Sequence, residues 1–214
     1  MSDMTLYRKT EHRGYACKVY FDPDPTSPAE WDTLGTIYSN SRDYNPCKHK
    51  IDEILVEGDD GFMHIDPEYV SVPIYCYEHG GIALHPARTG QFADKWDSGF
   101  FGVMAVHKDK IKEEGFGDIR IKSNRDNVID CLRSEIEVWN MYYQGIVFGY
   151  VVEDEDGCET DSCWGFYGLD GAEEAMAEGI DIIDAIVDEA ERKDAEEKAR
   201  IQHYEMVTEP FWID

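Results

Sequence analysis

The chain has 214 residues, of which 46 are acidic and 20 are basic, so its formal net charge is −26. With 42% hydrophobic and 13% aromatic residues it is too rich in core-forming side chains to be intrinsically disordered. So strong a negative charge excludes direct binding to nucleic acid or to an anionic membrane, and it makes a basic protein, or a basic groove on one, the natural partner.

Five stretches in the first half of the chain have the alternation or the aromatic and β-branched content of strands. These stretches cover residues 16–21, 31–39, 71–77, 82–84 and 99–107. A proline-rich loop over residues 22–28 follows the first stretch, and Ile51, Ile54 and Leu55 fit a helical turn. A Gly-Gly pair separates the third and fourth stretches, which we therefore expect to form a hairpin.

The second half of the chain predicts helices and another hairpin. A short helix over 108–114 precedes the clearest helix, 125–143, which Ser123 or Asn124 can cap. Strands over 146–152 and 162–167 flank an Asp-Gly turn. The tail has an apolar stripe at helical spacing, with acids on its solvent side. The members of this stripe are Met176, Ile180, Ile183, Val187 and Ala190.

These elements indicate the α+β class, with a mainly antiparallel sheet, a central helix at about 125–143 and a long acidic C-terminal helix at about 172–204. We expect a core domain over 1–170 and an acidic helical extension over 171–214. An amphipathic helix is not stable alone, so its apolar stripe must pack on the core or on a partner subunit. The second case would give a homodimer through the C-terminal helix.

The negative charge is distributed unevenly. Residues 1–107 carry a net charge of −8 and residues 108–214 carry −18. General solubility and salt adaptation are two explanations that need no partner. Salt adaptation predicts an even spread of acids with few lysines, whereas this chain has 11 Lys and 9 Arg. A partner-binding surface in the C-terminal half is the third explanation.

A cytoplasmic location is expected. The sequence has no 18-residue apolar run, and its first residues lack the basic and apolar regions of a signal peptide. Its six cysteines are dispersed without a C-x-x-C pair, so we expect reduced and mostly buried thiols.

Two segments resemble one another, at residues 96–102 and 161–168. Each combines Asp-Ser, a tryptophan and a run of glycine, two aromatic residues and glycine. One interpretation is that both are strands of one core, pressed closely against a neighbouring backbone. The alternative is a shared ligand pocket with tryptophans on its floor. The residues of that pocket would be His79, Trp96, Asp97, Asp161 and Trp164.

Catalysis and cofactor binding have little support. His79, Asp97 and Ser98 are the residue types of a hydrolytic triad, but no G-x-S-x-G sequence accompanies them. The pairs Cys47/His49 and Cys158/Cys163 lack the spacing of a zinc site, and no nucleotide-binding glycine motif occurs. We therefore expect no metal and no cofactor, and a protein that is not an enzyme.

The acidic tail can be compared with a phosphate backbone. One carboxylate every three to four helical residues gives about one charge per 5 Å, against one per about 3.4 Å on a DNA strand. Two rows of carboxylates, or one row with the acidic turn before it, could approximate a phosphate track. The candidate partner-binding residues are Asp154, Glu155, Asp156, Glu174, Glu178, Asp181, Asp184, Asp188, Glu191 and Asp194.

The segments at 28–36, 77–82, 96–99, 134–143 and 161–168 resemble an uncharacterised family of phage and prophage proteins. The run Asp-Ser-Cys-Trp-Gly-Phe-Tyr-Gly is the most specific part, and the likeness covers roughly residues 17–170. The chain departs from the family at 44–48, where relatives have a Gly-Asp segment. The resemblance implies an accessory gene of a virus or mobile element, with no established activity.

The leading hypothesis is an acidic, non-enzymatic binding protein of phage or mobile-element origin. It would inhibit a nucleic-acid-binding host or defence protein, such as a restriction or CRISPR factor, by stoichiometric binding and DNA mimicry. The first alternative is a small-ligand-binding protein or hydrolase-like enzyme that uses His79, Asp97 and Asp161. The second alternative is a virion or assembly component.

Overall fold

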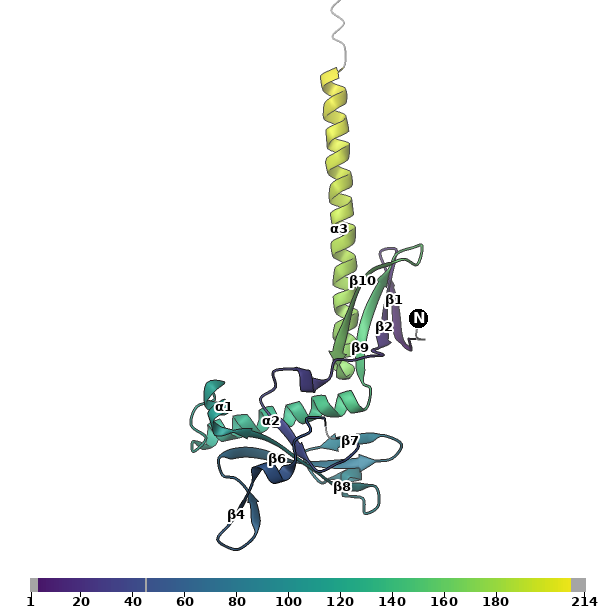
Figure 1. Ribbon diagram of the computed structural model, residues 1–214. Coiled ribbons are helices and arrows are strands. Elements are labelled where there is room, and N and C mark those ends of the chain that lie inside the picture. The colour runs from purple at the N-terminus through teal and green to yellow at the C-terminus, as the bar shows by residue number, and fades with distance from the viewer. Residues whose placement is uncertain (1–3, 45, 209–214) are drawn as a thin grey trace, which may run out of the picture. The chain divides into compact units, whose positions relative to one another are not determined.

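A computed structural model describes residues 4–44 and 46–208, with side chains through residue 204 (Figure 1). The chain divides into two compact units. Unit 1 comprises Met1–Pro23 and Phe148–Asp214, and unit 2 comprises Asp24–Val147. This division differs from the expected boundary at residue 170, because the C-terminal helix and the N-terminal strands belong to one unit. Within the described residues, no helix is both long enough and apolar enough to cross a bilayer.

Unit 1 is a four-stranded antiparallel sheet with one long helix. Its strands have the order β1-β2-β9-β10. The elements are β1 (Leu6–His12), β2 (Tyr15–Phe21), β9 (Val147–Glu153), β10 (Glu159–Tyr167) and α3 (Gly168–Thr208). β9 is buried along almost its whole length because it lies in the middle of the sheet. β1 was not expected from the sequence, since its alternating residues are mostly polar and exposed.

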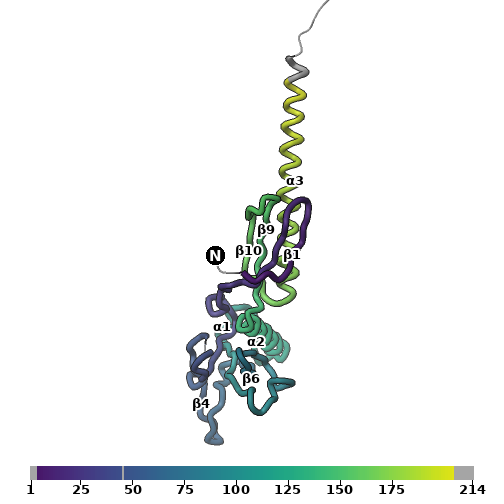
Figure 2. The backbone as a smooth tube through the Cα atoms, turned by 90° about the vertical axis from the view of Figure 1, so that its right-hand side faces the viewer, coloured from purple at the N-terminus to yellow at the C-terminus, as the bar shows by residue number. Residues whose placement is uncertain are grey.

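The first half of α3 packs on this sheet through small residues. Ala172, Ala175 and Ile183 are buried, and Gly179 lies so close to β2 that an added Cβ would be 2.4 Å from the Cys17 Sγ atom. The expected apolar stripe is therefore shorter than predicted. Its members Ile180 and Val187 are half-buried and Ala190 is exposed. Figure 2 shows α3 continuing beyond the ends of both hairpins of unit 1.

Unit 2 contains a second four-stranded antiparallel sheet, with the order β3-β8-β6-β7. Its strands are β3 (Thr36–Ser39), β6 (Tyr69–Glu78), β7 (Ile82–His85) and β8 (Ser98–His107). A small separate hairpin joins β4 (Leu55–Glu57) to β5 (Met63–Ile65). The remaining elements are η1 (Pro28–Glu30), η2 (Ile51–Ile54), η3 (Gly90–Ala93), α1 (Lys108–Glu113) and α2 (Lys122–Tyr143).

α2 covers one face of the unit 2 sheet. Its buried residues Leu132, Ile136 and Trp139 pack in the core with the alternate residues of β6. The predicted cap was wrong, because the N-cap position is Ile121 and no side chain caps it. Ser123 and Asn124 lie inside the first turn instead.

The α+β class and the long C-terminal helix are confirmed, and the helices and strands predicted from hydrophobic pattern are present. The strand expected over 31–39 is limited to Thr36–Ser39, because Trp31 ends η1. The thiols are less buried than expected. Cys17 and Cys76 are buried and Cys158 is exposed, while the other three are half-buried. All six are free.

Candidate functional site

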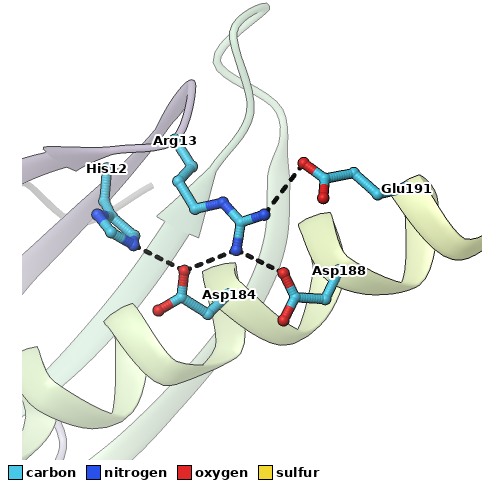
Figure 3. Close-up of polar contacts among 5 residues, drawn as sticks. All are labelled: His12, Arg13, Asp184, Asp188 and Glu191. Atoms are coloured by element: carbon cyan, nitrogen blue, oxygen red, sulfur yellow. Dashed lines mark hydrogen bonds and ion pairs between the residues drawn. The ribbon is translucent and has the colours of Figure 1, made fainter.

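The turn between β1 and β2 holds part of the acidic helix. Arg13 lies in a two-residue turn with Gly14, and its φ of 47° is uncommon for a residue with a side chain. Its guanidinium donates from Nη1 to Asp184 at 3.0 Å and to Asp188 at 2.6 Å, and from Nη2 to Glu191 at 3.2 Å (Figure 3). His12 Nε2 lies 2.8 Å from the same oxygen of Asp184. Three of the ten predicted partner-binding acids therefore form ion pairs within unit 1.

The other bases of the β1–β2 hairpin are also paired. Arg8 contacts Glu173 of α3 at 2.6 Å, and Lys18 contacts Glu153 of β9 at 2.5 Å. Lys9 pairs with Glu11 on its own strand at 2.9 Å. The hairpin thus neutralises one flank of α3, and it is the functional feature that sequence reasoning missed. The Arg-Gly pair at its turn was the available signal.

The side of α3 opposite the sheet keeps its carboxylates free. Glu174, Glu178 and Asp181 are exposed, and none of them forms an ion pair with a described residue. At about 100° per residue they lie on the helix face opposite the buried Ala172 and Ile183. We call these three acids the back row. Residues 168–187 contain six acids and no lysine or arginine, so the row lies in the most acidic part of the helix.

The outer half of α3 has a different charge pattern. Residues 188–204 contain six acids and four bases, and Ala190 through Tyr204 are exposed. Arg192 forms ion pairs with Glu189 and Glu196 one turn away on either side, and such pairs stabilise a helix that has no packing partner. Asp194 is exposed on this segment. A homodimer through this helix stays a prediction, and the apolar stripe that motivated it is largely used by the sheet of unit 1.

The acidic turn after β9 is built around Asp154. Its Oδ1 accepts N–H bonds from Asp156 at 3.0 Å and from Cys158 at 2.8 Å, so this carboxylate fixes the turn. Glu155 and Asp156 are exposed. The turn borders a hollow of about 560 Å³ that is lined by side chains of both charges from the two hairpin turns of unit 1.

The residues of the expected pocket belong to different units. His79, Trp96 and Asp97 are in unit 2, whereas Asp161 and Trp164 are in unit 1. The shared pocket therefore stays a prediction, without support from the geometry of either unit.

In unit 1, Asp161 accepts a hydrogen bond from the Tyr150 hydroxyl at 2.8 Å. Burial and this carboxylate raise the pKa of Tyr150 well above its usual range. The Trp164 ring lies over Gly149, where an added Cβ would be 2.2 Å from it. Both residues thus have packing roles, as expected of strands that lie close to a neighbouring backbone. The expectation that the two similar segments are strands of one core was wrong, because β10 belongs to the unit 1 sheet and β8 to the unit 2 sheet.

A hydrolytic site has no geometric basis in the described residues. His79 Nδ1 lies 3.6 Å from Asp97 Oδ2, which is too long for a hydrogen bond, and both side chains are substantially exposed. The Ser98 hydroxyl donates to the backbone oxygen of Asp94. Burial raises the pKa of the Cys76 thiol, so this cysteine is protonated at neutral pH. In residues 4–44 and 46–208, no three His, Cys, Asp or Glu side chains are grouped as metal ligands.

Comparisons with protein-family models, with curated proteins and with solved structures found no significant match to this chain.

Replacing Arg13 by glutamine is expected to loosen the outer contact between α3 and the hairpin. The variant leaves Asp184, Asp188 and Glu191 as three like charges without their common cation. We expect faster amide hydrogen exchange in residues 184–191 than in the native chain. Exposed Lys198 provides the control, since Lys198→Gln also removes one positive charge from unit 1. Unchanged exchange in the Arg13 variant would contradict this role.

The same contact is expected to be lost in acid. Hydrogen bonds from Arg13 and His12 lower the pKa of Asp184 in the folded chain. A lowered pKa means that the contact contributes its full stability above the ordinary pKa of Asp, about 3.9, and loses it as the pH falls through the lower folded value. Amide hydrogen exchange of residues 184–191 is measured at several pH values from mildly acidic to below about pH 4. In the native chain these amides should lose protection as the pH falls, and in Arg13→Gln the change should be absent.

Proposed function

We propose that this protein is a stoichiometric binding protein that blocks a basic, nucleic-acid-binding protein. The back row carries the proposal, because Glu174, Glu178 and Asp181 present three exposed carboxylates without cations on a helix held by a sheet. A surface fixed before binding loses little conformational entropy on association. Free carboxylates on such a surface attract Lys and Arg side chains that otherwise contact phosphates.

The spacing of the back row suits a phosphate-binding groove. Its members are separated by four and three residues, which corresponds to about 5 Å along the helix axis. Adjacent phosphates of one DNA strand are about 3.4 Å apart along the duplex axis. Glu155 and Asp156 add two further exposed carboxylates in unit 1. The proposed mode of action is therefore partial mimicry of a nucleic-acid backbone.

The distribution of charge favours this function over a general acidic coat. An acidic surface that serves only solubility or salt adaptation predicts a net negative charge that is spread evenly over the helix. Residues 168–187 carry six acids and no bases, whereas residues 188–204 carry six acids and four bases, so the net charge is concentrated in the first part of the helix although the density of acids is similar. The family resemblance at 161–168 supports a phage or mobile-element origin. A host restriction or CRISPR-type factor in the cytoplasm is the partner that such an origin favours.

The experiment compares two triple variants with the same change of charge. Glu174→Gln/Glu178→Gln/Asp181→Asn removes the back row, and its control neutralises three exposed acids of unit 2. The control variant is Glu113→Gln/Glu114→Gln/Glu137→Gln. Each immobilised chain is exposed to bacterial lysate, and the retained proteins are identified and then challenged with duplex DNA.

We expect the native chain and the control to retain basic nucleic-acid-binding proteins that DNA displaces. The back-row variant should bind these proteins about tenfold more weakly, and higher salt should weaken binding by the native chain. Equal retention by both triple variants would show that total charge, and not the back row, is responsible. Retained proteins that DNA does not displace would contradict mimicry.

A further inference from the structure

The unit 2 sheet has an aromatic face that α2 does not cover. Val72, Ile74 and Cys76 of β6 point into the core shared with α2, so the alternate residues of this strand point to the opposite side. These alternate residues include Pro73, which is exposed, and the half-buried Tyr75 and Tyr77. Elements η2 and β5 cover the other end of this side, where Ile54 packs against Val103 and Ala105. η3 contacts β6 and β8, and its Phe92 stacks on His85, the β7 partner of Tyr75, so η3 leaves Tyr75 and Tyr77 only half exposed.

Neighbouring strands and loops extend the aromatic surface. Phe100 is 58% exposed, and its ring lies 6.1 Å from that of Tyr75 in an edge-on arrangement. The His79 ring stacks on Tyr77 at 6.1 Å. Trp96, in the loop before β8, is 91% exposed. We define the aromatic face as Tyr75, Tyr77, His79, Trp96 and Phe100.

The loop that carries Trp96 is tightly fixed. Asp94 Oδ1 accepts the N–H of Trp96 at 2.8 Å and that of Asp97 at 3.1 Å. The Ser98 hydroxyl also donates to the backbone oxygen of Asp94. The backbone oxygen of Asp97 accepts the N–H of Glu78 at 2.8 Å, which ties the loop to the end of β6. A constrained loop therefore presents a large indole to solvent, although burying that ring would be favourable.

Carboxylates border the aromatic face. Glu78 is exposed at the end of β6, and Asp97 is partly exposed beside His79. No described lysine or arginine pairs with either carboxylate, and Lys95 is the single base within residues 94–100. Glu78 accepts from the Cys76 thiol and Asp97 lies near His79, so neither carboxylate is neutralised by a lysine or arginine. Aromatic rings next to such carboxylates form a chemical environment that suits an organic cation. The ring faces attract positive charge, and the carboxylates accept its N–H donors.

We propose that the aromatic face binds arginine side chains of a basic partner protein. That the partner is basic is taken from the proposed function. The new element is a second, separate contact surface, which lies on unit 2. Guanidinium is planar and weakly hydrated, so it stacks on aromatic rings more readily than ammonium does. The net charge of −26 repels nucleic acid and disfavours a second copy of this chain as the occupant.

The test uses the full chain with two synthetic probes, a short all-arginine peptide and an all-lysine peptide of the same length. Binding is measured by titration calorimetry in about 0.5 M salt, where the screening length is about 4 Å and long-range attraction is weak. The variants are Trp96→Ala and Trp96→Phe. Phe62→Ala is the matched control, since Phe62 is 69% exposed on the β4–β5 turn of the same unit.

We expect the native chain to prefer the arginine peptide about fivefold, because both peptides carry the same charge. Trp96→Ala should remove this preference, Trp96→Phe should keep part of it, and Phe62→Ala should leave it unchanged. Equal affinities for the two peptides, or an arginine preference that survives Trp96→Ala, would overturn the proposal. So would self-association in sedimentation that Trp96→Ala abolishes, since the occupant would then be a second copy.

The outcomes separate this inference from the proposed function. The back-row variant Glu174→Gln/Glu178→Gln/Asp181→Asn changes unit 1 and should keep the arginine preference. If that variant loses its basic partners while Trp96→Ala has no effect on the peptides, only the aromatic face is refuted. If the arginine preference depends on Trp96 while the back-row variant still captures its partners, only the role of the back row is refuted.

Discussion

Replacing Gly179 by valine is expected to separate α3 from the sheet of unit 1. A Cβ at this position would lie 2.4 Å from Cys17 Sγ and 3.3 Å from the Tyr150 ring. Both neighbours are fully or almost fully buried, so they have little room to move. Overpacking of this kind costs about 1–3 kcal/mol and occasionally more, which exceeds the gain of under 1 kcal/mol from removing a helical glycine.

Hydrogen exchange followed by mass spectrometry would locate the damage. Amides of β2 and α3 should lose protection in Gly179→Val, whereas amides of β6 and β8 in unit 2 serve as an internal reference. The control is Ala177→Val, because Ala177 is exposed two residues earlier on the same helix. Its effect should be about 0.5 kcal/mol, the helix-propensity difference. Native protection of β2 in Gly179→Val would contradict the proposed close contact.

Replacing Glu135 by alanine is expected to destabilise unit 2 by about 2–5 kcal/mol, because two buried N–H groups would lose their acceptor. One Glu135 oxygen accepts the N–H of Leu34 at 2.6 Å and the other accepts that of Gly35 at 2.8 Å. Leu34 is 8% exposed and Gly35 is buried, so water cannot easily replace the carboxylate. Urea denaturation gives the free energy of unfolding. Glu137→Ala, at an exposed position of α2, should change it by less than about 0.5 kcal/mol.

Glu135 also predicts a pH dependence. Burial raises its pKa, and the N–H groups of Gly35 and Leu34 oppose the rise without cancelling it. A raised pKa means that the contribution to stability is full below the ordinary value of about 4.3 and is lost as the pH rises through the folded value. The difference in unfolding free energy between the native chain and Glu135→Gln should therefore grow as the pH is lowered toward 4.3. A constant difference would contradict the raised pKa.

The sequence pattern predicted those elements that have a continuous apolar side. The residues of α2 and β8 are strongly periodic, so their apolar sides could be recognised before the fold was known. β1 could not be recognised in this way. Four of its seven residues are Arg8, Lys9, Glu11 and His12. Arg8 and His12 pair with acids of α3, and Lys9 and Glu11 pair with each other.

The candidate site was predicted less completely for the same reason. From the sequence pattern alone, all ten candidate acids were expected to face solvent and could not be distinguished. The Arg13 contacts divide them, because a cation more than 170 residues away pairs with Asp184, Asp188 and Glu191. Asp161 and Asp97 were similarly placed in one pocket by their matching motifs. In the fold, the Asp161 carboxylate accepts from the Tyr150 hydroxyl in unit 1, whereas Asp97 lies in a loop of unit 2.

Composition and the periodicity of single segments were sufficient to predict the α+β class and the long acidic helix, and both are present in the fold. Which carboxylates remain free and which aromatic residues reach solvent became known only from the folded chain. Both depend on contacts between residues far apart in the chain, such as Arg13 with Asp188, and a Coulomb interaction depends on distance in space. On α3, the carboxylates are thereby divided into a flank that is paired with bases and a back row that is unpaired.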